Sequence, residues 1–97
     1  MAEFFTYTTW RVRPGMEEEF VRRWEDWSYW SAVEGLVEQA RLLRDADDPL
    51  SFVSFGKWMN IADVRAWRSR PGYAERVARL QELVESFEPK TYEVVRG

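Results

Sequence analysis

The sequence predicts a single α+β domain of the ferredoxin-like type, in which a four-stranded antiparallel sheet carries its helices on one face and pairs with a second copy as a dimeric α+β barrel. Three observations predict this fold. Segments of strand and helix character follow the order strand, helix, strand, strand, helix, strand, which is the split βαβ pattern. The chain, 1–97, has the length of one domain and is too short for two. Its strands carry large side chains at both odd and even positions, so both sheet faces need cover.

The first strand is predicted at 4–13, where nearly every residue is aromatic, β-branched or long-chained. Pro14 and Gly15 end this strand, and three consecutive glutamates, 17–19, then favour the positive end of a helix dipole. The apolar residues of this helix recur every three or four positions, at Met16, Phe20, Trp24, Trp27 and Trp30. Gly35 is expected to end the helix as its C′ residue.

A hairpin is predicted to follow the first helix. Residues 36–44 alternate imperfectly between apolar and polar and predict the second strand. The polar turn 45–49 is short enough to join it to an antiparallel third strand at 50–59. Gly56 lies inside the third strand, where a glycine usually marks a bulge or a close backbone approach.

The last part of the chain predicts two helical segments and a strand. Asn60 has the character of an N-cap, with Asp63 as the third residue of the cap, so a helix is expected at 61–67. Pro71 and Gly72 end or kink it. The next helix is predicted at 73–87 from the stripe Tyr73, Val77, Leu80 and Val84. Pro89 is expected to end this helix, before a terminal strand at 91–95.

A homodimer is expected from the two faces of the sheet. In the first strand one parity carries Phe4, Trp10 and Val12, while the other carries Phe5 and Tyr7. Helices on one face leave the other bare, and a bare face rich in aromatic residues is an association surface. Packing two such faces around a two-fold axis is the simplest closed arrangement.

The composition excludes several function classes. Without Cys or His the chain lacks the groups for a zinc site, a Cys nucleophile, a Ser-His-Asp relay or His-ligated haem. A net charge of -3 argues against nucleic-acid binding. We expect no membrane partner and a cytoplasmic location, because no apolar run has the length of a membrane span and the N-terminus lacks signal-peptide character. Consecutive residues on a helix point in different directions, so Glu17–Glu19 cannot converge on one metal ion. The sequence contains no glycine-rich nucleotide-binding loop.

Five stretches resemble the antibiotic biosynthesis monooxygenase family: 12–20, 42–49, 52–58, 66–73 and 87–92. They cover nearly the whole chain in the family's order. The resemblance implies a dimeric α+β barrel and, for the best-known branches, oxygenation of aromatic polyketides or quinols without a cofactor, or degradation of haem. A shared fold does not fix the reaction, so the residues must be compared position by position.

The resemblance implies a pocket lined by an Asn, a Trp, a Tyr and an Arg in the anthrone oxygenases, with the Trp six residues before the Tyr. Trp67 and Tyr73 reproduce this spacing. The Asn position holds Asp63, with Asn60 one turn away, and the Arg position holds Phe87. In the haem-degrading branch an Asn and a His would stand where this chain has Thr8 and Val77, so haem degradation is rejected.

The leading hypothesis is therefore a cofactor-independent monooxygenase that acts on a small aromatic substrate with molecular oxygen. Such a reaction needs an apolar pocket, a hydrogen-bonding group near a phenolate and exclusion of water. The proposed catalytic residues are Trp67, Tyr73 and Asn60. The proposed substrate-binding residues are Thr8, Trp10, Trp24, Trp27, Trp58, Asp63 and Val77.

Structural roles remain open for the same residues. Trp24 and Trp27 lie on a helical stripe that is typical of a core, and Asn60 fits a simple N-cap. Tyr73 fits a helix-start tyrosine whose ring packs while its hydroxyl meets solvent. Two other functions fit the sequence: a non-catalytic dimeric barrel that binds a small hydrophobic ligand, and a non-oxidative polyketide cyclase.

Overall fold

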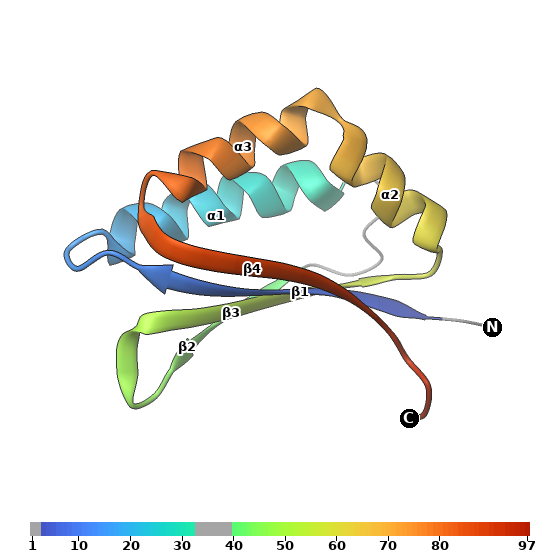
Figure 1. Cartoon of the computed structure of the whole chain (residues 1–97), viewed down its shortest axis with the longest axis horizontal. Coiled ribbons are helices and arrows are strands. Elements are labelled where there is room, and N and C mark those ends of the chain that lie inside the picture. The colour runs from blue at the N-terminus through green and yellow to red at the C-terminus, as the bar shows by residue number, and fades with distance from the viewer. Residues whose placement is uncertain (1–2, 33–39) are drawn as a thin grey trace.

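The computed structural model describes residues 3–32 and 40–97, which form one sheet and a layer of helices. Along the chain the elements are β1 (Phe4–Val12), α1 (Glu17–Ala32), β2 (Arg41–Asp45), β3 (Asp48–Trp58), α2 (Ile61–Ser69), α3 (Pro71–Gln81) and β4 (Val84–Glu93). The strands are antiparallel, in the order β2-β3-β1-β4. All the labelled helices lie on the same side of the sheet (Figure 1). The ferredoxin-like α+β fold is therefore confirmed.

β1 is the central strand that fixes which side chains share a face. It pairs with β3 on one side and with β4 on the other, so that Thr6 lies between Gly56 and Thr91, and Tyr7 between Phe55 and Lys90. Side chains along a strand alternate between the two faces. Even-numbered residues of β1 and β3 therefore face the helices, and odd-numbered residues face away from them.

The core fills the space between the helices and the sheet. Phe20 and Trp58 are fully buried, and Trp10 is 3% exposed. Burial of side chains this large stabilises the fold by about 1.5–3 kcal/mol each. The other buried apolar residues are Val12, Trp24, Trp27, Phe52, Val64, Trp67, Val77, Leu80, Leu83 and Val84.

The local signals around α2 are confirmed. Asn60 has extended backbone angles, and its side-chain oxygen accepts a hydrogen bond from the backbone N–H of Ala62 at 2.8 Å. α2 ends at Ser69, and α3 begins at Pro71. Proline suits the first position of a helix, because the N–H group that it lacks would have no partner within the helix. Pro71 and Gly72 thus begin a helix immediately after ending one.

The prediction that this last helix continues to Phe87 is wrong. α3 ends at Gln81, and β4 begins at Val84, so Pro89 lies inside a strand instead of ending a helix. Between β1 and β4 the register shifts at Arg11/Val12. The shift leaves one extra residue in β4, which puts Val84 and Phe87 on the same sheet face although they are three positions apart. Three is also the spacing of a helical stripe, and this explains the error.

The predicted hairpin is correct in type and wrong in detail. β2 and β3 are joined at Ala46 and Asp47 alone, because Asp45, Asp48 and Pro49 of the predicted turn belong to the strands. Of the two roles expected for Gly56, a bulge or a close backbone approach, the bulge is absent, since Gly56 pairs with Thr6 in continuous register. Residues 36–39 of the predicted second strand, and Gly35 as the end of the first helix, lie outside the described residues.

The sheet face away from the helices carries a set of apolar side chains, and no described helix covers it (Figure 1). We call this surface the outer face. Two ring contacts cross it, between Phe5 and Phe55 with centroids 6.3 Å apart and between Tyr7 and Tyr92 at 6.0 Å. Leu43 and Tyr92 are 46% and 50% exposed. The apolar residues that share this face through the registers are Phe5, Tyr7, Leu43, Val53, Phe55 and Tyr92.

Candidate functional site

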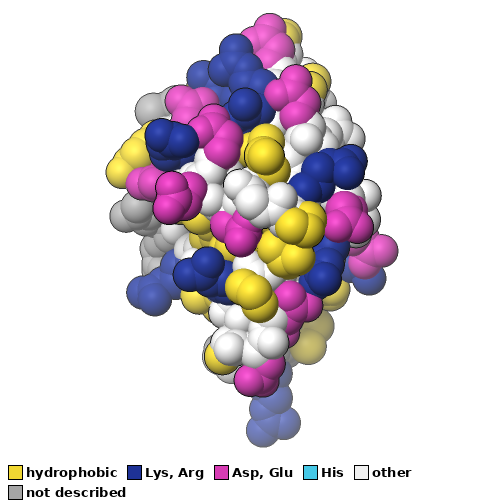
Figure 2. All heavy atoms as spheres, turned by 90° about the vertical axis from the view of Figure 1, so that its left-hand side faces the viewer, with side chains coloured by type: hydrophobic (Ala, Val, Ile, Leu, Met, Phe, Trp, Pro, Cys, Tyr) yellow, Lys and Arg dark blue, Asp and Glu magenta, His cyan; other side chains and the backbone are white. Residues whose placement is uncertain are grey.

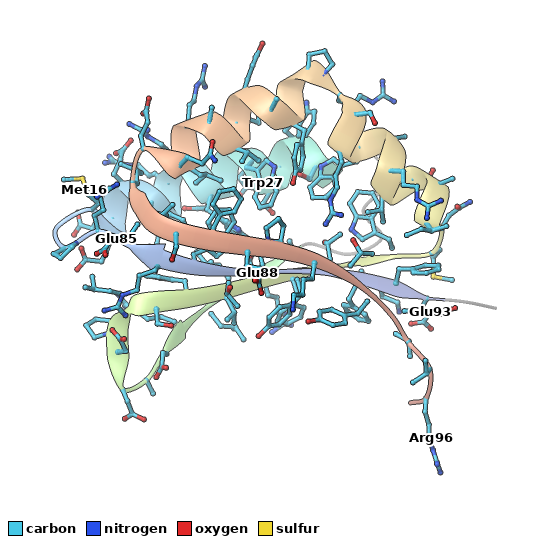
Figure 3. All side chains as sticks on the ribbon, viewed as in Figure 1. Met16, Trp27, Glu85, Glu88, Glu93 and Arg96 are labelled. Atoms are coloured by element: carbon cyan, nitrogen blue, oxygen red, sulfur yellow. The ribbon has the colours of Figure 1, made fainter. Side chains whose placement is uncertain are left out.

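An aromatic cluster surrounds Trp67, where all three helices approach the sheet. The Trp67 ring stacks on Trp27 of α1 with centroids 5.6 Å apart, and meets Trp58 of β3 at 5.0 Å. Tyr73 of α3 packs edge-on against Trp67 at 4.8 Å and against Trp27 at 6.1 Å. Figure 3 labels Trp27 in its place between the helices and the sheet. Three residues that the sequence marks as site candidates, Trp27, Trp58 and Tyr73, thus all contact a fourth, Trp67.

Local chain geometry brings Trp67 and Tyr73 together. Trp67 shares the buried face of α2 with Val64, one turn earlier. α2 then stops at Ser69, and the short connection to Pro71 places Tyr73 in the first turn of α3, back against the Trp67 ring. The six-residue spacing therefore matters because it spans the break between two helices.

Three tryptophans of the core have a partner for the indole N–H. Trp10 donates to Ser54 Oγ at 2.9 Å, Trp58 to Thr6 Oγ1 at 3.1 Å, and Trp67 to Ser31 Oγ at 2.9 Å. Each buried N–H is paired with a hydroxyl, as buried donors normally are. The hydrogen bond to Ser31 fixes the orientation of the Trp67 ring within the cluster.

Trp24 and Trp27 differ, because their indole N–H groups are buried with no hydrogen-bond partner among the described residues. An unsatisfied buried donor costs about 1–3 kcal/mol unless a water or ligand oxygen accepts from it. The Trp27 ring contacts both Trp67 and Tyr73. A ligand oxygen at Trp27 would therefore lie inside the aromatic cluster.

Tyr73 is held in its neutral form. Burial raises the pKa of Tyr73 above its usual value, while the nearby Arg68, by its charge and as a hydrogen-bond donor, acts in the opposite direction and is outweighed. At neutral pH the Tyr73 hydroxyl therefore keeps its proton and can donate it in a hydrogen bond to a carbonyl or phenolate oxygen.

A cavity of about 410 Å³ lies under α2 at the Phe4 end of the sheet. Its helical wall consists of Ile61, Val64, Arg65 and Arg68, which recur at the spacing of one helix face. Phe4, Thr91 and Glu93 form the sheet wall. Arg68 also lies over the Trp67 ring, with its guanidinium carbon 5.9 Å from the ring centroid. Arg68 therefore connects this cavity with the Trp67–Tyr73 pair.

The remaining candidates from the sequence lie elsewhere. Asn60 and Asp63 are exposed, and the Asn60 side chain is engaged in capping α2. Thr8, Trp10, Trp24 and Val77 are buried between sheet and helices. Phe87, at the position of the family's arginine, stacks on Trp10 with centroids 5.4 Å apart and supplies no charge.

From the sequence, Arg68 belongs to a basic stretch that could attract an anionic substrate and is better explained as ordinary surface charge, and neither Thr91 nor Ser31 is assigned a role. A usable signal existed for Arg68, because it follows Ile61 and Val64 on the same helical face that buries Trp67. Ser31 follows Trp27 by one turn and donates to its carbonyl at 2.7 Å, but no pattern indicated that it would also accept from Trp67. Thr91 depends on the register of β4, which the sequence did not predict.

A second cavity, of about 430 Å³, lies between α1 and α3 and is lined only by charged residues. Arg23 donates to Glu19 at 2.9 Å and to Glu82 at 2.8 Å, and Arg76 lies 3.3 Å from Asp26. Figure 2 shows that positive and negative side chains are interspersed over the Met16 end of the molecule. The groove is an ion-paired contact between helices and offers no apolar wall to an aromatic ligand.

Within the described ranges no group of three or more acidic, histidine or cysteine side chains is placed to hold a metal ion. None of the helices in these ranges combines the length and apolar character of a membrane span.

Comparison with known proteins relates the chain to one family. The family model of the antibiotic biosynthesis monooxygenases matches residues 4–79. Curated protein sequences gave no match. The crystal structure of SnoaB, a cofactor-independent oxygenase from Streptomyces nogalater, has a TM-score of 0.89 at 20% identity, covering 100% of this chain and 97% of SnoaB.

Two further solved structures give the same result. A SnoaB variant with one asparagine replaced by alanine has a TM-score of 0.90 at 22% identity and covers 98% of this chain and 95% of that chain. Protein SO0527 from Shewanella oneidensis has a TM-score of 0.82 at 18% identity, with coverage of 95% and 90%. At these identities the similarity shows a common fold.

Proposed function

Because the chain belongs to the antibiotic biosynthesis monooxygenase family, we propose that it is a cofactor-independent monooxygenase of an electron-rich aromatic small molecule of polyketide or quinol type. The observation that carries the proposal is the Trp67–Tyr73 pair. Its tyrosine is half-buried, neutral and close to the Arg68 cation. SnoaB, which shares the fold, is a cofactor-independent oxygenase and supports the same reaction class.

The chemistry needs no group beyond the substrate and O₂. For an anthrone-type methylene, the substrate releases a proton, and the carbanion passes one electron to O₂. The substrate radical and superoxide then join at carbon as a peroxide, which takes up a proton and loses water. One CH₂ group and one O₂ thus become one C=O group and one H₂O, and the substrate supplies all the electrons.

The protein's contribution is to stabilise the anion and to exclude water. The Tyr73 hydroxyl donates to the substrate oxygen on which negative charge accumulates, which is the electrostatic stabilisation that most lowers such barriers. The Trp27 N–H is a second donor without a partner among the described residues. The Trp67 and Trp27 rings, which both contact Tyr73, make the surroundings of its hydroxyl apolar, and the low polarity strengthens both hydrogen bonds.

We also propose that two copies pair through the outer face. That face brings aromatic residues from β1, β3 and β4 together, including Phe5, Phe55 and Tyr92, and the described helices leave it uncovered. A surface of this kind lowers its free energy by contact with an identical surface around a two-fold axis. The family resemblance implies the same assembly.

A second candidate is a dimeric barrel that binds an aromatic ligand without oxidising it. Trp67 favours a binding function without turnover, because its ring is only 4% exposed and its N–H already donates to Ser31, so it has no free group for a reacting substrate. Phe87 also leaves the family's arginine position uncharged. Both candidates predict binding of an aromatic ligand, and they differ in turnover.

Oxygen consumption separates the two candidates. The wild-type protein, treated with a chelator, is mixed with a panel of anthrones and hydroquinones in an oxygen-electrode cell, and the products are identified by mass. Tyr73→Phe is expected to lower kcat by about 10²-fold, the typical loss of one oxyanion donor. Tyr29→Phe, at a tyrosine of α1 that is 64% exposed, is the matched control and should leave kcat unchanged. If wild type and Tyr73→Phe show the same negligible oxygen consumption with every substrate, the monooxygenase proposal fails and the binding function remains.

A further inference from the structure

We infer that Arg68 is the anion-binding residue of the site, and that the cavity under α2 selects aromatic molecules that carry a phenolate or carboxylate. The inference deepens the proposed function and rests on it only for the identity of the substrate's reaction. Two observations carry the inference. Each is a buried polar atom that has no hydrogen-bond partner among the described residues, and the two atoms belong to residues on opposite walls of the same cavity.

The first of these atoms is Arg68 Nε. It is buried, and no described residue accepts a hydrogen bond from it. No ion pair joins Arg68 to a described carboxylate, although other arginines such as Arg11, Arg23 and Arg76 all have one. A buried cationic donor without an acceptor is costly, and a bound oxyanion is the partner that its forked geometry fits best.

The second atom is Thr91 Oγ1, which is also buried without a partner among the described residues. Thr91 stands on β4 opposite Thr6, whose hydroxyl accepts from Trp58. Thr91 thus belongs to the sheet wall of the cavity and Arg68 to its helical wall, and each holds a buried polar atom without a partner among the described residues. A single oxyanion between them would satisfy both.

The rest of the lining suits an aromatic body. Phe4, Ile61 and Val64 are apolar, and Val64 is 1% exposed. Flat rings pack well against such walls, and a pocket that combines them with a few polar groups is typical of small-molecule sites.

The charges around the cavity favour a ligand with one negative charge. Arg65 and Arg68 face a single carboxylate, Glu93, which Figure 3 places on β4 toward its end under α2. Two cations against one anion leave one positive charge to be balanced. Glu93 would repel a more highly charged ligand such as a phosphomonoester.

Arg68 also links anion binding to the tyrosine. The guanidinium lies over the Trp67 ring and close enough to Tyr73 to act on its hydroxyl. An anion bound at Arg68 would therefore lie beside the donor that the reaction uses. This arrangement gives the chain a positive charge at the site, although position 87 holds a phenylalanine.

Ligand binding under nitrogen tests the inference. The probes are 2-naphthoate and the neutral 2-naphthamide, which differ in charge and have nearly the same shape, and binding is followed by calorimetry. Wild type should bind the carboxylate at least tenfold more tightly than the amide. Arg68→Gln should weaken carboxylate binding by about 10- to 100-fold, the usual effect of losing a hydrogen bond to a charged group, and leave amide binding unchanged. Thr91→Val should weaken carboxylate binding by a smaller factor.

Two further variants serve as controls. Arg68→Lys retains the charge but lacks the Nε–H donor, so it should bind the carboxylate less tightly than wild type and more tightly than Arg68→Gln. Unchanged amide binding in both variants would show that the loss is not a folding defect. Arg79→Gln removes an arginine from the groove between α1 and α3 and should change neither affinity. Equal binding of the two probes by wild type, or full carboxylate affinity in Arg68→Gln, would overturn the inference.

The experiment separates this inference from the proposed function because no oxygen is present. A carboxylate preference that depends on Arg68, in a protein that oxidises nothing, would refute the monooxygenase proposal alone. Oxygen consumption with an anionic substrate whose KM is unchanged by Arg68→Gln would refute the Arg68 inference alone.

Discussion

The indole N–H of Trp67 donates to the Ser31 hydroxyl at 2.9 Å, and that hydroxyl donates in turn to the backbone carbonyl of Trp27 at 2.7 Å. One serine in the last turn of α1 thus ties α2 to α1 and orients two stacked tryptophans. This hydroxyl is therefore a polar link between α1 and α2 inside the aromatic cluster.

Ser31→Ala is expected to lower the free energy of unfolding by about 1–3 kcal/mol, because it leaves the Trp67 N–H buried without an acceptor. Urea denaturation followed by tryptophan fluorescence measures the change. Ser69→Ala is the matched control, since Ser69 Oγ donates to the Arg65 carbonyl at 2.9 Å in the same way but is exposed. We expect that control to change stability by less than about 0.5 kcal/mol. Equal effects of the two substitutions would contradict the role assigned to Ser31.

Tyr73 is expected to ionise only above the usual pH of about 10, because burial raises its pKa. The folded-state pKa is the higher one, so the contribution of Tyr73 to stability is fully present below pH 10 and is lost as the pH rises through the folded pKa. The difference in absorbance at the tyrosinate band between wild type and Tyr73→Phe, titrated against pH, gives this value. A transition in the difference spectrum below pH 10 would show that Arg68 outweighs burial.

Phe55→Lys is expected to convert a dimer into monomers, because it places a charge in the middle of the outer face, beside Phe5. Sedimentation velocity over the micromolar range measures the assembly state. Tyr29→Lys, at an exposed position on α1, is the control and should leave the dimer intact. A wild-type protein that sediments as a stable, folded monomer throughout that range would rule out the proposed pairing.

Gly72→Ala is expected to destabilise the protein by about 1 kcal/mol through overpacking, although alanine favours a helix more than glycine does. A Cβ at this position would lie 2.7 Å from Cζ2 of Trp30. The Trp30 ring is also held by Arg76, whose guanidinium carbon lies 5.0 Å from the ring centroid. The same substitution in a Trp30→Leu background should be neutral or stabilising. Thermal denaturation of the four proteins of this double-mutant cycle gives the coupling, and additive effects would show that Trp30 yields without cost.

The sequence predicted those elements whose signals are local. Asn60 and Pro71 mark the beginnings of α2 and α3 because a cap and a helix-start proline act on their own backbone. The end of α3 could not be predicted in the same way. Val84 and Phe87 share a face because of an irregularity in the pairing of β4 with β1, and that pairing involves residues more than seventy positions away.

The candidate site was predicted in its aromatic part and missed in its polar part. Trp67 and Tyr73 are close because of a fixed spacing across a helix break, which can be recognised along the chain. Arg68 and Thr91 meet at one cavity only when α2 is laid on the β4 end of the sheet. The helical face that Arg68 shares with Ile61 and Val64 can be recognised along the chain, but its meeting with Thr91 depends on the three-dimensional arrangement.

Pro89 in the middle of β4 has a consequence for self-association of another kind. β4 is an outermost strand, and a proline is accommodated there only where its missing N–H would have pointed away from β1. A strand from another molecule that paired with this edge would find no backbone N–H donor at Pro89, in the middle of β4. Pro89 therefore opposes the growth of fibrils by addition of strands to the edge that β4 forms.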